Sequence, residues 1–337
     1  MTELSGSQFR SAWWLPGPHL QTLWAALASP KPQLTTSRER LELDDGDFLD
    51  LDWVGAQSGP LVVVLHGLEG SIDSSYVRRI LHRVVKHGWG GLLIHFRGCS
   101  GEPNRLTRSY HSGETGDLRF VLRLLRERYP TRQLMTIGYS LGGNVLLKFL
   151  GESPQQEMPD AAVAVSVPFD LASGADRLSR GFSKLYQKRL VGSLHEKTRR
   201  KFAARKHPFS LKDLKYWDDF WSFDNHVTAP LHGFKNATHY YAESSCRQFL
   251  PAVRTPTLII HSTDDPFLYP DVVPSQNELS DTTSLRLTNQ GGHVGFVSGR
   301  FPFKAIYWLD NEIMRWLQER HRDDDEQHET GRNLEVD

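Results

Sequence analysis

The stretch Gly138-Tyr139-Ser140-Leu141-Gly142 decides the fold, because it places a serine between two glycines where an apolar run meets a helical pattern. The apolar run covers residues 134–137, and the helical pattern covers residues 143–150. A serine in such a turn adopts a strained backbone conformation, and glycine on both sides removes the collisions that a Cβ would cause. The turn is typical of a nucleophile elbow, in which the hydroxyl is exposed above a sheet beside the free N–H groups of a helix start.

Short apolar runs recur along the chain and alternate with helical periodicity. They are rich in β-branched residues and have no polar face, which is typical of strands buried on both sides, and they cover residues 61–65, 91–96, 134–139, 161–167 and 257–261. Helical patterns lie between them at residues 76–87, 117–129 and 144–150. Residues 40–43 and 48–53 flank an Asp-Gly step and predict an antiparallel hairpin. The order of elements predicts an α/β fold of the α/β-hydrolase type, with a mostly parallel, doubly wound sheet.

The alternation stops after the fourth apolar run. Residues 169–249 are rich in charged and aromatic residues and carry no strong strand signal, which predicts a helical cap inserted into the core, although a surface insertion without a gating role has the same composition. The core then comprises residues 37–168 and 250–321. We expect residues 1–36 to pack on the core and residues 322–337 to form a disordered acidic tail.

The cap segment also holds the densest basic cluster of the chain. Helical periodicity covers residues 182–190 and 196–206, and the cluster lies in the second run: Lys197, Arg199, Arg200, Lys201, Arg205 and Lys206. A solvated helix face is the interpretation that we favour over an anion or lipid headgroup site.

The charge balance argues against a nucleic-acid partner. The 337 residues include 40 basic and 40 acidic side chains, so no excess of positive charge is available for a phosphate backbone. Two cysteines, Cys99 and Cys246, are too few for a disulfide framework and lack C-x-x-C spacing. We therefore expect a reducing, cytoplasmic compartment.

No signal-peptide pattern and no apolar run of about 18 residues is present in the sequence, so we expect no transmembrane segment. Several apolar side chains near the N-terminus would close over the core, with peripheral membrane contact as the alternative; they are Trp13, Trp14, Leu20, Leu23 and Trp24.

A nucleophilic serine needs a base within hydrogen-bond reach and an acid that orients the base. In this fold the order along the chain is serine, acid, histidine. Asp265 follows the strand predicted at residues 257–261 and is the preferred acid, because Pro266 fixes the turn directly after it. Asp264 and Asp170 are alternatives, for which we expect turn and helix capping instead.

The best candidate for the base is His293. It lies in the glycine-flanked loop 290–296, between a strand predicted at residues 284–288 and a terminal helix that starts near Phe303. Glycines allow such a loop to carry an imidazole over the sheet. His66 is a rival whose place before a glycine suits a role in shaping its own loop.

Two backbone N–H groups should stabilise the oxyanion of a tetrahedral intermediate. One is that of Leu141, directly after the serine, and the other is that of Leu68 in the glycine-rich loop after the first buried strand. Cys99 lacks a base at recognisable spacing and is not favoured as a nucleophile. The chemistry requires neither a metal ion nor an organic cofactor.

Five motifs carry a family resemblance: HGLEGS at 66–71, HFRGCSGEPNR at 95–105, YHSGET at 110–115, GYSLGGN at 138–144 and GGHVGF at 291–296. The chain resembles the YheT-like branch of the α/β-hydrolases, also called the AB hydrolase-4 family, from residue 18 to residue 316. The resemblance implies Ser140 as nucleophile, Asp265 as acid and His293 as base. It also implies activities like those of carboxylesterases, acylglycerol and phospholipid hydrolases, and alcohol acyltransferases.

The sequence thus predicts a serine hydrolase that cleaves carboxylic esters with short or medium acyl chains, or acylglycerol-like lipids, through an acyl-enzyme. Acyl transfer to an alcohol and thioester hydrolysis are alternatives that use the same three residues. A non-catalytic binding module is a further alternative, since hydrolase folds also serve as receptors. The expected partner is a small-molecule acyl ester.

Overall fold

The computed structural model describes residues 8–152 and 158–334, with the backbone alone for residues 322–334. Its centre is an eight-stranded sheet in the order β1-β2-β4-β3-β5-β6-β7-β8. Strand β2 runs antiparallel to both of its neighbours, and the other neighbouring pairs are parallel. The strands are β1 (Ser37–Glu42), β2 (Phe48–Gly55), β3 (Leu61–Leu65), β4 (Gly90–Ile94), β5 (Leu134–Tyr139), β6 (Ala161–Val165), β7 (Thr257–Ser262) and β8 (Thr283–Thr288). The predicted sheet and hairpin are confirmed.

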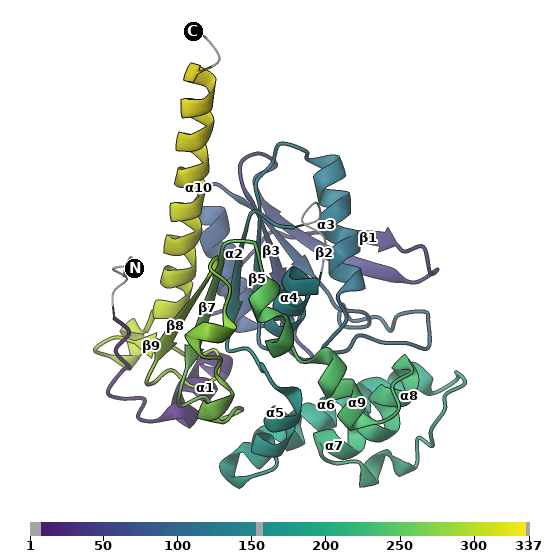
Figure 1. Cartoon of the computed structure of the whole chain (residues 1–337). Coiled ribbons are helices and arrows are strands. Elements are labelled where there is room, and N and C mark those ends of the chain that lie inside the picture. The colour runs from purple at the N-terminus through teal and green to yellow at the C-terminus, as the bar shows by residue number, and fades with distance from the viewer. Residues whose placement is uncertain (1–7, 153–157, 335–337) are drawn as a thin grey trace.

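Helices cover both faces of this sheet (Figure 1). The four that do so are α2 (Ser75–Lys86), α3 (Gly116–Arg128), α4 (Leu141–Glu152) and α10 (Trp308–Leu334). Along β3, Val62 and Val64 share one apolar cluster with α2 and α10, whereas Leu61, Val63 and Leu65 share another with α3 and α4. Successive strand residues point to opposite faces, so a strand without polar residues contributes to two cores at once.

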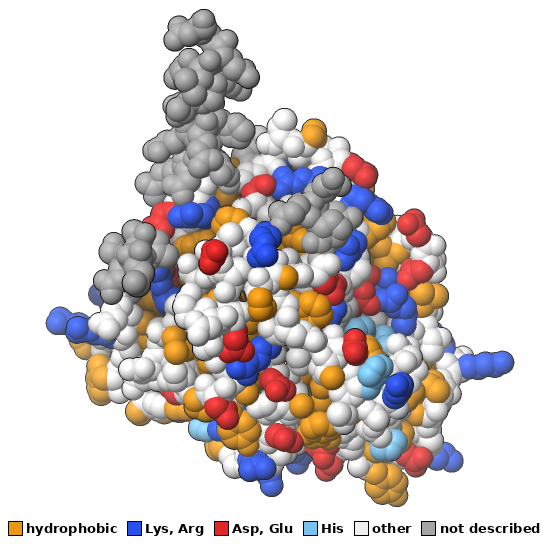
Figure 2. Space-filling model, in the orientation of Figure 1, with side chains coloured by type: hydrophobic (Ala, Val, Ile, Leu, Met, Phe, Trp, Pro, Cys, Tyr) orange, Lys and Arg blue, Asp and Glu red, His pale blue; other side chains and the backbone are white. Residues whose placement is uncertain are grey.

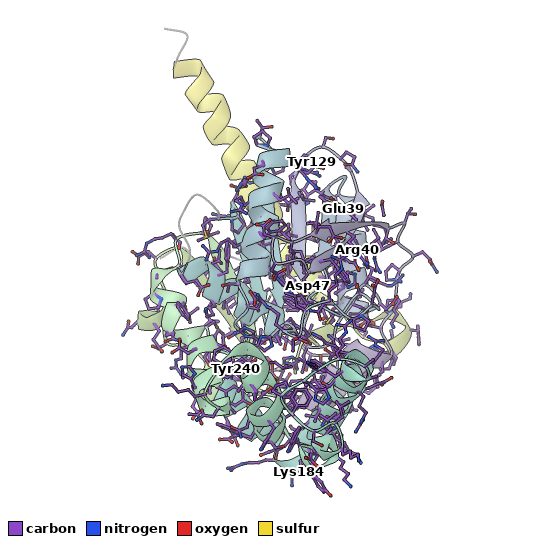
Figure 3. The ribbon with its side chains drawn as sticks, turned by 90° about the vertical axis from the view of Figure 1, so that its right-hand side faces the viewer. Glu39, Arg40, Asp47, Tyr129, Lys184 and Tyr240 are labelled. Atoms are coloured by element: carbon purple, nitrogen blue, oxygen red, sulfur yellow. The ribbon has the colours of Figure 1, made fainter. Side chains whose placement is uncertain are left out.

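After β6 the chain leaves the sheet, and it returns at β7. The α-helices in between are α5 (Leu171–Leu178), α6 (Lys184–Phe202), α7 (Phe220–Phe223), α8 (Ala229–His232) and α9 (Ala237–Ser244). They form a cap at one end of the molecule, and Figure 3 shows Lys184 and Tyr240 of the cap at the opposite end from Tyr129, which follows α3. The cap has an apolar centre of its own, in which Val191, Leu214, Phe223 and Val227 pack together.

Helix α6 is one continuous helix, whereas the sequence predicts two helical runs in this region. Val191, between the two runs, is buried in the apolar centre of the cap. Tertiary packing of this kind outweighs the weak helix propensity of the following Gly192.

The described part of the N-terminal segment packs on the C-terminal part of the core. Helix α1 (Pro18–Leu27) carries Gln21, whose side chain bonds both the carbonyl and the N–H of Val297, at 3.0 and 2.7 Å. Val297 belongs to β9 (Val297–Ser298), which pairs with β10 (Ile306–Tyr307). Residues 1–7 of the predicted segment lie outside the described residues.

Helix α10 continues to Leu334, so the structure differs from the disordered tail expected at residues 322–337. Its first turns are anchored in the core by Trp308, Leu309, Ile313 and Leu317. Extending a helix that packing has already nucleated costs little free energy per residue, and the C-terminal end of α10 projects beyond the rest of the molecule (Figure 1). Residues 335–337 lie outside the described residues.

On the face drawn in Figure 2, basic and acidic side chains are interspersed, and neither kind forms a separate patch. This distribution matches the equal numbers of basic and acidic residues in the sequence. Within residues 8–152 and 158–334, no helix has both the length and the apolar character needed to cross a membrane.

Candidate active site

Ser140 lies in the tight turn between β5 and α4, with a backbone φ of 52°. This left-handed conformation is sparsely populated for residues other than glycine. A Cβ on Gly142 would lie 2.6 Å from the carbonyl oxygens of Leu65 and His66, and a Cβ on Gly138 would lie 2.5 Å from the Gly142 carbonyl oxygen. Gly142 therefore allows the serine turn to press against the end of β3, and Gly138 allows the turn itself to close tightly.

Ser140, His293 and Asp265 form a continuous hydrogen-bonded chain. His293 Nε2 lies 2.9 Å from Ser140 Oγ, and His293 Nδ1 lies 2.8 Å from Asp265 Oδ2. Because an ionised carboxylate only accepts hydrogen bonds, Nδ1 carries the proton and Nε2 is free to accept one from the serine. Asp265 is 4% exposed, its Oδ1 accepts the Phe267 N–H at 2.8 Å, and the Phe267 ring stacks on the imidazole.

The loop that carries His293 is fixed by side chains from three distant parts of the chain. Gly292 N–H donates to Asp264 Oδ1 at 2.9 Å, His293 N–H donates to Thr22 Oγ1 at 2.9 Å, and Val294 N–H donates to Ser166 Oγ at 3.0 Å. Asp264 therefore supports the loop that carries His293, whereas the sequence led us to expect that it would cap its own turn. Nothing in the sequence near Thr22 or Ser166 indicated these roles.

Glycine at position 292 is required by close packing as well as by its φ of 60°. A Cβ there would lie 2.5 Å from the Pro18 carbonyl oxygen and 2.6 Å from Thr22 Oγ1. The sequence analysis explains this glycine by the room that it leaves for the His293 ring. In the structure, close contact with α1 is a further reason why no side chain fits at position 292.

The two N–H groups predicted for an oxyanion hole are both unoccupied. Neither Leu68 N–H nor Leu141 N–H has an acceptor among the residues that the structure describes. The loop after β3 passes directly beside the serine, since a Cβ on Gly67 would lie 3.4 Å from Ser140 Cβ.

Among the described residues, three neighbouring N–H groups of the same loop have acceptors, unlike Leu68 N–H. The pairs are Gly67 N–H to Tyr76 Oη at 2.8 Å, Glu69 N–H to Tyr110 Oη at 3.0 Å and Gly70 N–H to Gly67 O at 3.0 Å. Leu68 N–H, which the sequence predicts as an oxyanion donor, therefore lies among N–H groups that are already bonded.

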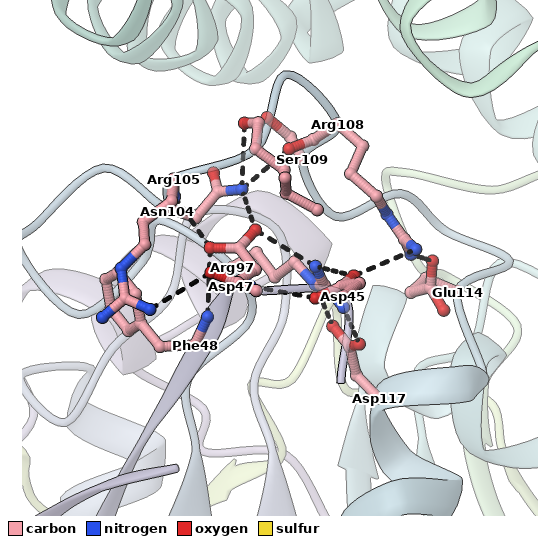
Figure 4. Close-up of polar contacts among 12 residues, drawn as sticks. Asp45, Asp47, Phe48, Arg97, Asn104, Arg105, Arg108, Ser109, Glu114 and Asp117 are labelled. Atoms are coloured by element: carbon pink, nitrogen blue, oxygen red, sulfur yellow. Dashed lines mark hydrogen bonds and ion pairs between the residues drawn. The ribbon is translucent and has the colours of Figure 1, made fainter. Parts of the chain in front are cut away.

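Tyr110 contacts this loop, and an ionic network joins residues that precede and follow it in the sequence, among them Arg108 and Glu114 (Figure 4). Arg97, 4% exposed, binds Asp45 at 2.7 Å, Asp47 at 3.1 Å and Asp117 at 2.7 Å. One guanidinium thereby joins the β1–β2 turn, the segment after β4 and the first turn of α3. A buried charge needs such partners to offset the loss of hydration.

The rival residues have structural roles. His66 is buried, its Nδ1 contacts the Gly67 carbonyl oxygen and its Nε2 accepts the Phe96 N–H, and burial lowers its pKa to about 3. Asp170 is the N-cap of α5, where it accepts the Ser173 N–H at 3.0 Å. Burial raises the pKa of the Cys99 thiol to about 11, which disfavours the nucleophilic thiolate.

A cavity of about 570 Å³ opens beside Ser140 and His293. Its walls are mainly apolar and come from both the core and the cap, with cap contributions that include Leu171, Ala175, Leu178, Phe220, Phe223 and Leu231. Among the described residues no group of His, Cys, Asp or Glu side chains is arranged to hold a metal ion. The site is therefore a largely apolar chamber with a serine, an imidazole and two N–H donors at its floor.

The predicted solvated face for the basic cluster is wrong for two of its members. Lys197 binds Glu69 Oε1 at 2.9 Å, and Lys201, 4% exposed, binds Asn104 Oδ1 and the Arg108 carbonyl oxygen at 2.7 and 2.6 Å. Helix α6 turns these lysines toward the core, whereas Arg199 and Arg200 stay exposed. Burial lowers the pKa of Lys201 to about 7.

Comparisons with known proteins agree with this geometry. A family model described as "alpha/beta hydrolase fold" matches residues 60–299. An esterase of Pyrococcus furiosus, Pf2001, superposes with a TM-score of 0.53 at 17% identity, covering 79% of this chain and 88% of that one. The chain therefore belongs to the α/β-hydrolases.

Relatives with higher sequence identity assign the chain to one branch of the α/β-hydrolases. YheT of Escherichia coli (strain K12) is 42% identical over 305 residues, or 89% of each chain. The monoacylglycerol lipase of Saccharomyces cerevisiae is 32% identical, covering 78% of this chain and 60% of its own length, and the phospholipase ABHD3 of Bos taurus is 27% identical, covering 88% and 75%. The chain belongs to the YheT-like branch, as its motifs predict.

Proposed function

We propose that this protein hydrolyses carboxylic esters, with Ser140 as nucleophile, His293 as general base and acid, and Asp265 as the orienting carboxylate. The observation that carries the proposal is the chain of hydrogen bonds from Ser140 Oγ through His293 to Asp265, at 2.9 and 2.8 Å. Such a chain activates a hydroxyl that is otherwise a poor nucleophile at neutral pH.

The reaction proceeds in two halves. His293 Nε2 takes the Ser140 proton as Oγ attacks the acyl carbon, and the resulting oxyanion accepts hydrogen bonds from Leu68 N–H and Leu141 N–H. His293 then gives the proton to the departing alcohol oxygen as the ester C–O bond breaks. His293 then deprotonates a water molecule, which attacks the acyl carbon. The bond between that carbon and Ser140 Oγ breaks, His293 returns the proton to Oγ, and the carboxylic acid is released.

The cavity supports an acyl ester as the substrate class. Its apolar walls match an acyl chain, and about 570 Å³ accommodates a short or medium chain with its alcohol group. Two relatives are named as a monoacylglycerol lipase and a phospholipase, which supports acyl esters of lipid type. Both cysteines are unpaired, which supports the reducing, cytoplasmic compartment that we propose.

Replacement of the nucleophile tests the proposal. We expect Ser140→Ala to lower kcat/KM on p-nitrophenyl esters of graded chain length by at least about 10³-fold, because the triad acts as a unit. We also expect a fluorophosphonate probe to label the wild type and not the variant. Unchanged hydrolysis by folded Ser140→Ala, checked by circular dichroism, would refute the function.

A further inference from the structure

Glu69, the residue after the proposed oxyanion donor Leu68, is held unusually firmly. Its backbone is left-handed, with φ 53°, a conformation that costs a residue other than glycine free energy. The Tyr110 hydroxyl contacts both the backbone and the side chain of Glu69: it accepts the Glu69 N–H at 3.0 Å and donates to Glu69 Oε1 at 2.6 Å. The Leu68–Glu69 peptide is therefore tied to the position of the Glu69 side chain, and it directly follows the Gly67–Leu68 peptide, which carries the proposed donor N–H.

The third contact of Glu69 comes from the cap. Lys197 of α6 donates to Glu69 Oε1 at 2.9 Å and lies 2.8 Å from Cys99 Sγ and 4.5 Å from the centroid of the Tyr110 ring. The Lys197 and Glu69 side chains are 12% and 16% exposed, so the ion pair is largely shielded from water. This contact links a cap helix to the loop that lines the oxyanion hole.

The charges of Lys197 and Glu69 should affect the stability of the oxyanion. The Glu69 carboxylate belongs to the residue next to the donor that would stabilise the oxyanion, and an uncompensated negative charge there would repel the charge that develops on the acyl oxygen. Lys197 neutralises the carboxylate and fixes its position at the same time. The effect acts in the transition state more than in the ground state, because the ester carbonyl carries no net charge.

We propose that Lys197 is a positioning residue that completes the oxyanion hole from the cap, by holding and neutralising Glu69. The inference rests on the proposed function of Ser140 and Leu68. Lys201, one helical turn further along α6, fastens the same helix to Asn104 and Ser109 Oγ, at 2.7 and 2.8 Å. The oxyanion hole is therefore complete when α6 is seated on the core, and displacement of the cap breaks the contact.

Kinetics of Lys197→Met test the inference. We expect kcat on p-nitrophenyl butyrate to fall by about 10–100-fold, less than the loss of about 10²–10³ for removal of a whole donor, while KM changes by less than about threefold. Active sites are counted by fluorophosphonate titration, so that a loss of folded protein is not scored as a loss of rate. Binding of an alkylboronic acid, which mimics the tetrahedral intermediate, should weaken in proportion to kcat.

Three further variants separate this role from a general effect of the cap. Lys197→Arg, which keeps the charge, should retain more activity than Lys197→Met, and Lys188→Met, at an exposed position of the same helix, should match the wild type. Lys197→Met combined with Glu69→Gln should recover part of the lost kcat, because it removes the unpaired carboxylate.

Distinct outcomes would overturn the inference. A kcat for Lys197→Met equal to that of Lys188→Met, a rise in KM with unchanged kcat, or a double variant no better than Lys197→Met would each reject the role of Lys197. These outcomes leave the proposed function intact if Ser140→Ala is inactive. Full activity of Ser140→Ala would instead reject the proposed function itself.

Discussion

Asp264 and Asp265 are neighbours in the sequence, but the turn after β7 gives them different partners. Asp265 Oδ2 contacts His293 Nδ1 at 2.8 Å, whereas Asp264 Oδ1 accepts the Gly292 N–H at 2.9 Å. Burial raises the pKa of Asp264. One carboxylate therefore orients the imidazole, and the other supports the backbone that carries it.

The Asp265→Asn variant tests this assignment. The amide would favour the tautomer of His293 that cannot accept the Ser140 proton, so we expect kcat for ester hydrolysis to fall by about 10⁴-fold. The matched Asp264→Asn variant keeps an oxygen acceptor for Gly292 N–H and should lose less than about tenfold. Steady-state kinetics of the two variants give the comparison, and equal losses would contradict the assignment of Asp265.

Helix α1 supports the imidazole although it lies more than 250 positions away in the sequence. Thr22 Oγ1 accepts the His293 N–H at 2.9 Å and donates to the Pro18 carbonyl oxygen at 2.8 Å. The Thr22 side chain therefore connects the first turn of α1 to the loop that carries His293, the proposed base.

Replacing this hydroxyl by a methyl group should affect both stability and rate. In Thr22→Val the His293 N–H loses its acceptor, so we expect the free energy of unfolding to fall by about 1–3 kcal/mol and kcat to fall with it. Thr22→Ser, which keeps the hydroxyl, is the control and should stay near the wild type. Urea denaturation and steady-state kinetics on the same samples measure the two effects. Equal unfolding free energies and equal kcat values for Thr22→Val and Thr22→Ser would contradict the role of the Thr22 hydroxyl.

The cap contains a buried carboxyl group whose titration should be visible in its stability. Asp224 accepts hydrogen bonds from Tyr241 Oη and Thr228 Oγ1, at 2.7 and 2.5 Å. Burial raises the pKa of Asp224 from 3.8 to about 6, although both hydrogen bonds lower it. The folded state therefore binds this proton more tightly than the unfolded state, and the resulting stabilisation, present below about pH 4, is lost as the pH rises through about 6.

Asp224→Asn removes this titration. We expect the free energy of unfolding of the wild type, relative to the variant, to decrease by about 2–3 kcal/mol between about pH 4 and pH 8. Urea unfolding of both proteins across this range measures the difference. Taking the difference cancels the contributions of other titrating groups, and a value independent of pH would show that Asp224 does not titrate in this window.

The cavity is assembled from segments that are far apart in the sequence. The loop after β3 and the serine turn form its floor, the cap forms much of its wall, and Thr22 and Leu23 of α1 also line it. Each segment packs through its own apolar cluster, and polar contacts such as that of Lys197 with Glu69 fix one segment against another. The proposed reacting groups therefore belong to the core, whereas the shape of the cavity depends largely on the cap.

Local sequence patterns were sufficient to predict the strands of the sheet, the turn around Ser140 and the candidate reacting groups. Ser140, Asp265 and His293 each follow a strand that periodicity identifies, and the carboxyl ends of parallel strands meet at one edge of a sheet. Leu68 and Leu141 follow from the same rule, because an N–H group beside the serine turn is placed by the backbone alone. Side-chain contacts between distant segments leave no such pattern.

The positions of the strands along the chain, the glycine-flanked turns and the candidate groups at the strand ends can thus be predicted from the sequence, since short-range sterics and hydrophobic periodicity govern them. The partners Thr22 and Ser166, and the inward direction of Lys197 and Lys201, depend on how α1 and α6 dock. The way in which these helices dock depends on burial, charge and packing contributions from many parts of the folded chain. For that reason a lysine predicted to face solvent instead supports the loop beside Ser140.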